Sequence, residues 1–265
     1  ETLRQRRSEG NTDAVPTQEV GCDGCGGSIT FSGTLTSSEC PYCARPIQRE
    51  KIHDSEQRVP VDGVLPFQIQ NKQARQALRD WVKSRWFAPG DFKKKGAQGQ
   101  FNGVYMPYWT YDTMTSVHFR GERGEHYYET VGSGENQKRE RRTRWHATAG
   151  SFDRFFDDVA VCAGSGLSHD VTTSLEPWPI DKCVPFNHEV IAGFMARTYD
   201  LPLDEGFQHA KRRIDAAIER GVRQEIGGDE QRIHDISSRY QAITYKHLLL
   251  PCWLLRCGSD QRPTA

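Results

Sequence analysis

The chain has 265 residues, and its 35 Lys and Arg residues balance its 35 Asp and Glu residues, so the formal net charge is zero. This length is enough for one large domain or two modest domains. Balanced charge provides no global basic field, which argues against nucleic-acid binding through overall charge alone. The longest apolar run, residues 248–255, is interrupted by Pro251 and is far shorter than the ~20 residues of a membrane span, so we expect no membrane-spanning segment.

Residues 1–18 are polar and show no hydrophobic periodicity, so they are predicted to form a disordered tail. Their content of Glu, Arg and Gln is unlike that of a signal peptide. Four cysteines farther along the chain lie among apolar residues, and we expect them to be buried free thiols: Cys162, Cys183, Cys252 and Cys257. Free thiols are typical of a reducing compartment, so these features together indicate a cytoplasmic protein.

Two Cys-x-x-Cys pairs, separated by 14 residues, lie within residues 19–47. Their cysteines are Cys22, Cys25, Cys40 and Cys43. Two such pairs present four thiolates to one tetrahedral Zn²⁺ at Zn–S distances of about 2.3 Å, although the separation is just below the usual range of about 15–20 residues. Short strands are predicted over 29–31 and 34–36, with a turn at Ser32-Gly33 between them, and this is the layout of a zinc ribbon.

Two other interpretations of the four cysteines stay open, a pair of disulfides and a redox-active Cys-x-x-Cys. A redox pair normally opens a helix in a thioredoxin-like unit, and no such helix is predicted here. If zinc binds, sulfur fills all four ligand positions and leaves none for a catalytic water. We therefore expect one structural Zn²⁺ that folds the ribbon and takes no part in catalysis.

Residues 48–62 are charged and are interpreted as a linker, and residues 63–265 as the body of the protein. The body opens with a predicted strand over 64–69. Asn71 is a suitable N-cap for the helix that follows, and Pro89-Gly90 is expected to end that helix. The apolar residues on one face of this helix are Ala74, Ala77, Leu78, Trp81 and Val82.

Several aromatic and histidine side chains are candidates without a motif. Trp81 and Trp86 are expected to lie in the core or in a lid, and stacking on a nucleobase is the alternative. His118, His126 and His146 fall on neighbouring predicted strands. A second metal site would require these three imidazoles to meet, and nothing in their spacing demands it.

A β-rich region follows, in which Thr, Tyr, Trp, Val and Phe are frequent. Strands are predicted over about 108–120, 125–131 and 139–148. Glycine-containing turns are predicted between them at 121–124 and 132–137. This order predicts an antiparallel meander.

Residues 138–145 form the most basic of these strands, with arginines at Arg139, Arg141, Arg142 and Arg144. One interpretation is an edge strand whose charges prevent pairing with other chains. The other is a ridge that contacts phosphates and has the aromatic side chain of Trp145 beside it. The balanced total charge favours the first interpretation.

Asp157 and Asp158 are adjacent carboxylates in a segment that could open a helix or end a strand. Neighbours in regular structure point apart, so a shared site would need partners from elsewhere in the chain. The strongest helix pattern covers residues 204–226 and ends at Gly227-Gly228. Its apolar residues form a continuous stripe on one face: Ala210, Ile214, Ala217, Ile218, Val222 and Ile226. Residues 243–250 then read as a strand.

A weak internal repeat links Met106-Pro107-Tyr108-Trp109 with Leu250-Pro251-Cys252-Trp253. Proline within a strand implies an edge or a bulge. The repeat would divide the body into two related halves, residues 63–180 and 181–265, and would place both tryptophans in equivalent core positions. Chance agreement of four residues is the alternative.

Six segments of the sequence resemble a family of bacterial zinc-ribbon proteins: 64–67, 85–89, 103–109, 155–159, 226–233 and 246–251. Members of this family are often labelled "primosomal protein N′ (replication factor Y)" or "transcription-factor-IIB-type zinc ribbon". The resemblance runs from about Cys22 to Leu255. The family usually continues with a further hairpin, whereas here residues 256–265 follow, so the final strand is expected to be absent.

A helicase of that name would need a phosphate-binding Gly-x-x-x-x-Gly-Lys-Ser/Thr loop, and the sequence contains none. Residues 96–99 lack the lysine and the hydroxyl residue of such a loop. Gly-x-Ser-x-Gly, His-Glu-x-x-His and Gly-x-Gly-x-x-Gly motifs are also absent from the sequence. We therefore expect neither helicase nor ATPase activity, and we interpret the primosomal label as a similarity of cysteine spacing.

These patterns together predict an α+β protein, in which a rubredoxin-like zinc ribbon precedes a mixed, mainly antiparallel sheet with two main helices. The first functional hypothesis is a non-enzymatic zinc-binding protein that contacts another protein or packs in an assembly. The alternative is a nucleic-acid-binding accessory factor of replication or transcription. It would use the ribbon, the arginines of residues 138–145, and three consecutive lysines, Lys93, Lys94 and Lys95.

Overall fold

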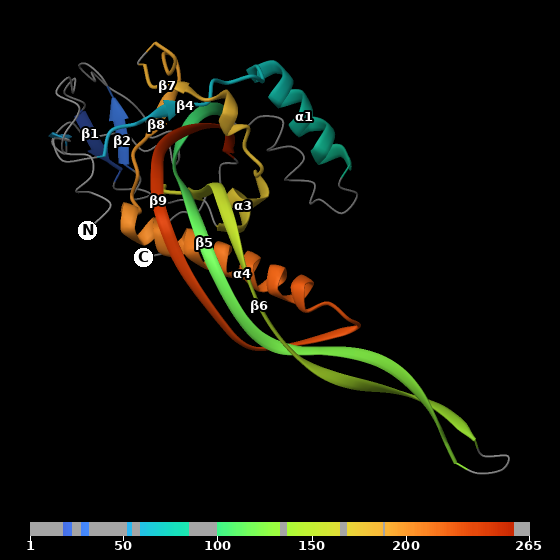
Figure 1. The fold of residues 1–265 in the computed structure, drawn as a ribbon. Coiled ribbons are helices and arrows are strands. Elements are labelled where there is room, and N and C mark those ends of the chain that lie inside the picture. Colours follow the sequence, from blue (N-terminus) through green and yellow to red (C-terminus); the bar gives the residue numbers. More distant parts are fainter. Residues whose placement is uncertain are drawn as a thin grey trace, which may run out of the picture. The chain divides into compact units, whose positions relative to one another are not determined.

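The fold is known from a computed structural model that describes residues 18–22, 28–31, 52–54, 59–84, 100–132, 137–164, 169–187 and 189–256. Over these residues it is an α+β fold with a mainly antiparallel sheet, as predicted (Figure 1). The described residues contain three α-helices, where two main helices were predicted. The chain forms two compact units. Unit 1 contains residues 1–110, 160–206 and 246–265, and unit 2 contains residues 111–159 and 207–245.

Unit 1 is organised around strands from distant parts of the sequence. The order across its sheet is β3 (Ile52–Asp54), β1 (Gln18–Gly21), β2 (Ser28–Phe31), β8 (Met195–Arg197), β5 (Gln100–Val131), β9 (Glu230–Arg256), β4 (Gly63–Val64) and β7 (Val184–Pro185). The β5–β8 and β4–β9 pairs are parallel, and β1 pairs antiparallel with both β2 and β3. Strand β3 lies within the segment that was predicted to be a linker.

The core of unit 1 lies along β5, where residues 104–110 are all buried. Trp109 is fully buried, its ring centroid lies 4.8 Å from that of Tyr199, and its Nε1–H donates to the Leu201 carbonyl at 2.9 Å. Trp253 is only half-buried and packs instead against Phe67, with ring centroids 4.9 Å apart. The two tryptophans of the proposed repeat therefore have different surroundings, and the prediction of equivalent core positions is wrong.

The first predicted helix is confirmed as α1 (Asn71–Ser84). Its cap differs from the prediction, because the Gln73 side chain accepts the Gln70 backbone N–H at 3.0 Å and the Gln70 carbonyl accepts the first helical hydrogen bond. Trp81 is 48% exposed, so it is not the core residue that was expected. Trp86 and the predicted helix end at Pro89-Gly90 lie outside the described residues.

Unit 2 consists of the outer parts of β5 and β9, most of strand β6 (Lys138–Cys162) and most of helix α4 (Leu203–Ile226). The predicted helix stripe is confirmed, because one face of α4 packs on the sheet in a single cluster. The buried members of this cluster are Val117, Phe119, Phe156, Ile214, Ile218, Val222 and Ile226. Gly227 and Gly228 end the helix with φ values of +64° and +75°, as predicted.

The predicted turn at 121–124 is wrong, because β5 runs without interruption from Gln100 to Val131. The two glycines serve close approaches instead. A Cβ at Gly121 would lie 2.3 Å from the Arg232 carbonyl oxygen of β9, and a Cβ at Gly124 would lie 2.8 Å from Thr143 of β6. Because glycine has no side chain, β5 can approach β9 closely at Gly121 and β6 closely at Gly124. The first reversal of the chain comes after Val131.

Two short helical segments complete the described structure, α3 (His169–Ser174) and the 3₁₀ turn η4 (Ile180–Lys182). Within the described residues, no helix is long and apolar enough to span a membrane.

Candidate functional site

Of the predicted zinc ribbon, the structure describes residues 19–22 and 28–31, which include one of the four cysteines, Cys22. Cys22 follows β1 directly and is 5% exposed. Strand β1 pairs antiparallel with β2 through Gly21 and Ser28, so the segment that carries the first Cys-x-x-Cys connects two paired strands. The remaining predicted ligands, Cys25, Cys40 and Cys43, lie outside the described residues, as do Lys93, Lys94 and Lys95.

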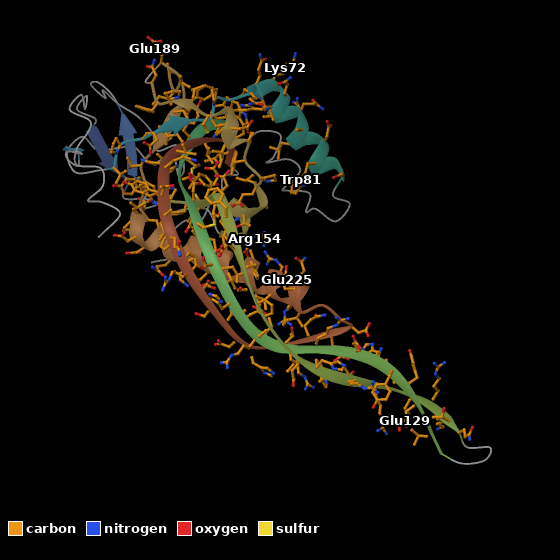
Figure 2. All side chains as sticks on the ribbon, viewed as in Figure 1. Lys72, Trp81, Glu129, Arg154, Glu189 and Glu225 are labelled. Atoms are coloured by element: carbon orange, nitrogen blue, oxygen red, sulfur yellow. The ribbon has the colours of Figure 1, made fainter. Side chains whose placement is uncertain are left out.

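The four predicted arginines of β6, Arg139, Arg141, Arg142 and Arg144, are exposed. They lie on the outer part of the β5–β6 hairpin, which extends beyond the start of β9 (Figures 1 and 2). We call residues 125–131 and 138–145 the distal hairpin. Figure 2 labels Glu129 on it, and the Glu129 carboxylate accepts from the Arg142 guanidinium at 3.0 Å.

Tyrosines and arginines pair on the distal hairpin. The Arg139 guanidinium lies 4.3 Å from the ring centroid of Tyr128, and the Arg144 guanidinium lies 5.0 Å from that of Tyr127. Tyr128 is nevertheless 57% exposed. Since a cation over a ring face is attracted by its quadrupole, these contacts hold both side chains in position at the surface.

A set of polar contacts joins the start of β9 to the base of the distal hairpin. The Asp229 N–H donates to the Gly124 carbonyl at 2.9 Å, and the His126 N–H donates to the Asp229 carboxylate at 2.7 Å. Glu230 then contacts His126 Nε2 at 2.7 Å and accepts from the Thr143 hydroxyl at 3.0 Å. We call these five residues the clasp. Hydrogen bonds from His126 and Thr143 lower the pKa of Glu230.

Trp145, the aromatic residue beside the basic strand, also contacts β9. The Arg232 guanidinium lies 3.8 Å from the ring centroid of Trp145, and the ring would touch a Cβ at Gly124. One face of this ring is therefore used within unit 2.

The three candidate histidines do not form a site, because the only group with metal-ligand spacing among the described residues is acidic.

That acidic group consists of Asp112, Asp157 and Asp158, whose carboxylate oxygens lie within 4.8 Å of one another. Adjacent Asp157 and Asp158 share a site because φ at Asp158 is +49°, which breaks the alternation of the strand. The third carboxylate, Asp112, accepts from the Asp158 N–H at 2.8 Å and from the Thr244 hydroxyl at 3.1 Å. Oxygen ligands of this kind suit hard cations, but both Asp112 oxygens already accept hydrogen bonds within the fold.

Two of the predicted buried thiols lie in the core of unit 1. Burial raises the pKa of Cys162, and burial together with the neighbouring Cys162 thiol raises that of Cys252 to about 12. Both thiols are free, as expected. A raised pKa keeps a thiol protonated at neutral pH, which is opposite to what a catalytic nucleophile needs. Cys183 is only half-buried, and Cys257 lies outside the described residues.

Comparison with known proteins gives one distant similarity. The uncharacterized protein YdjG of Bacillus subtilis (strain 168) is 24% identical over 194 residues, which cover 72% of this chain and 55% of YdjG. The chain thus spans about half the length of the curated relative that it matches. No family model matches the sequence, and no solved structure matches the fold.

Proposed function

We propose that this chain is a non-enzymatic zinc-binding protein that acts as a protein-interaction or assembly module without helicase activity. We also propose that it is related to the bacterial zinc-ribbon proteins that the sequence resembles. The observation that carries the interaction role is the distal hairpin, because it presents ordered aromatic and cationic side chains to solvent. The zinc role depends on the spacing of the four cysteines.

Zinc would be held by Cys22, Cys25, Cys40 and Cys43, and it would supply folding free energy to the N-terminal ribbon. The support for this is the buried position of Cys22 next to the β1–β2 pair. Metal analysis of the purified chain in reducing buffer tests the proposal. We expect one zinc per chain, and a value near zero would contradict it.

The distal hairpin is two-stranded, and two strands alone are marginally stable in water. Three of its apolar side chains are exposed: Tyr127 by 36%, Tyr128 by 57% and Val131 by 36%. Tyrosine and arginine are also the residue types that contribute most to protein interfaces. A protein partner that covers this surface would bury these side chains and stabilise the hairpin.

Affinity purification with the full chain as bait tests this role. Tyr127→Ser combined with Tyr128→Ser should remove the specifically enriched partner, as measured by quantitative mass spectrometry. Phe155→Ser is the matched control, because Phe155 is 55% exposed in unit 2 but lies outside the distal hairpin. Equal recovery of every protein with all baits would contradict the proposal.

A nucleic-acid-binding accessory factor is the second candidate, favoured by the exposed arginines of β6. Phosphate contacts make affinity fall steeply with salt concentration. A gel-shift series with single- and double-stranded DNA at increasing salt therefore separates the two functions. Binding that is strong at low salt, and lost when Arg139 and Arg141 become Glu, would favour the second candidate.

A further inference from the structure

The outer edge of β6 is open along the distal hairpin. Within the described part of the chain, β6 pairs with β5 alone. The side chains of residues 138–142 and 144 are all exposed as well. The backbone N–H and C=O groups on the outer side of such a strand are a template on which another extended segment can pair.

The charge of this edge is strongly one-sided. Residues 138–145 contain five basic side chains and one acidic side chain, so their net charge is +4. Glu129 pairs with Arg142, and Arg141 interacts electrostatically with Glu230, but no ion pair within 4.0 Å joins Lys138 or Arg141 to a described carboxylate. The edge therefore carries more cationic charge than the described ion pairs of unit 2 offset.

The spacing of the arginines matches the spacing of side chains on any extended segment that could pair with β6. Side chains alternate between the two faces of a strand, so Arg139 and Arg141 share one face while Arg142 and Arg144 share the other. Residues two apart on one face are separated by about 6.5–7 Å in any extended segment. A segment that carries acidic residues on both of its faces would place carboxylates beside these guanidinium groups.

A second copy of this chain fits the edge poorly. Two β6 edges would bring a charge of +4 against another of +4, and like charges that face each other across strands are destabilising. The acidic residues on the β5 side of the hairpin are already paired. Glu125 contacts Arg123 at 3.0 Å, and Glu129 contacts Arg142 at 3.0 Å.

Single-stranded nucleic acid also fits poorly. Such strands bind by stacking bases on open aromatic faces. Here guanidinium groups lie over the rings of Tyr127, Tyr128 and Trp145.

We infer that the outer edge of β6 in the distal hairpin binds an extended acidic segment of another protein by strand addition. This inference rests on the proposed interaction function and names the kind of partner for it. Backbone hydrogen bonds to β6 would supply affinity, and the alternating arginines would select acidic residues on both faces of the added strand. The Arg139–Tyr128 and Arg144–Tyr127 contacts would hold two of these arginines ready.

The test uses the zinc-loaded full chain and a fluorescein-labelled peptide built of Glu-Glu-Val-Val repeats, with binding followed by fluorescence anisotropy. We expect Arg139→Glu with Arg141→Glu to weaken binding by about tenfold or more. The same substitutions to Lys should retain most of the binding. Arg212→Glu with Arg220→Glu, which reverses two exposed charges on α4, is the matched control and should leave affinity unchanged. Circular dichroism checks that every variant is folded.

A second peptide has the same sequence but carries N-methyl groups on alternate amides, which keeps its charge and blocks strand pairing. It should bind about tenfold or more weakly. Equal binding of both peptides would overturn strand addition, and no binding of the first would overturn the acidic partner. Tighter binding of oligothymidylate, or a dimer that Arg139→Glu with Arg141→Glu dissociates, would also overturn the inference. If peptide binding fails while the tyrosine variant still loses its cellular partner, the proposed function stands and only this inference is wrong.

Discussion

Strand β5 passes through two contrasting environments. Its residues 104–110 are buried in unit 1, whereas residues 127–131 in unit 2 are all exposed. The buried stretch is a nearly continuous run of apolar and aromatic residues, which is typical of a strand covered on both faces. The exposed stretch mixes tyrosines with Glu129 and Thr130. The first environment stabilises a fold, and the second leaves aromatic side chains available to a partner.

The largest effect on stability is expected in the buried part of β5. Trp109→Ala should lower the free energy of unfolding by about 3–5 kcal/mol, because it removes a fully buried ring and the hydrogen bond to the Leu201 carbonyl. Trp81→Ala on α1 is the matched control, and since Trp81 is 48% exposed the change should stay within about 1 kcal/mol. Urea unfolding measures both variants. Similar losses of unfolding free energy in both variants would contradict the prediction that the buried Trp109 stabilises the fold more than the exposed Trp81.

The next largest effect is expected at Gly121, where β5 lies close to β9. Gly121→Ala should destabilise unit 2 by about 2–3 kcal/mol, because the new Cβ would lie 2.3 Å from the Arg232 carbonyl oxygen. Gly221→Ala on α4 has its nearest neighbour at 3.4 Å and should be neutral or stabilising by up to about 1 kcal/mol. Amide hydrogen exchange in unit 2 measures both variants. A tolerated Gly121→Ala would show that the strands can separate at this crossing.

These glycines also show what sequence patterns could and could not predict. The stripe of α4 has a helical period that only one burial pattern satisfies, so its limits and its core face were predicted. Gly121 and Gly124 have the composition of a turn, and only the position of β9 reveals that they permit close contact. Asp112 and Asp158 lie on different strands and are far apart in the sequence. Their spacing therefore offered no reason to place them in one site. The clasp likewise depends on strand pairing.

A smaller effect is expected at the clasp. The pKa of Glu230 is lowered in the folded state, so this carboxylate contributes stability above its ordinary pKa of 4.5. That contribution is lost as the pH falls through the lower folded value. Glu230→Gln should remove this acid-side dependence and should speed amide exchange of His126, whose N–H is held by the adjacent Asp229. An unchanged exchange profile between neutral and acid pH would contradict the role of the clasp.

The smallest effect on stability belongs to the exposed end of β5. Tyr128→Ala should lower the free energy of unfolding by no more than about 1 kcal/mol, because its ring is 57% exposed and its main described contact is the Arg139 guanidinium at 4.3 Å. A double-mutant cycle with Arg139→Ala should give a coupling of about 0.5–1 kcal/mol. Additive changes would mean that the tyrosine does not hold the arginine in place. A partner would then have to order Arg139 itself, which weakens binding, so the cycle tests whether the exposed surface is organised before a partner arrives.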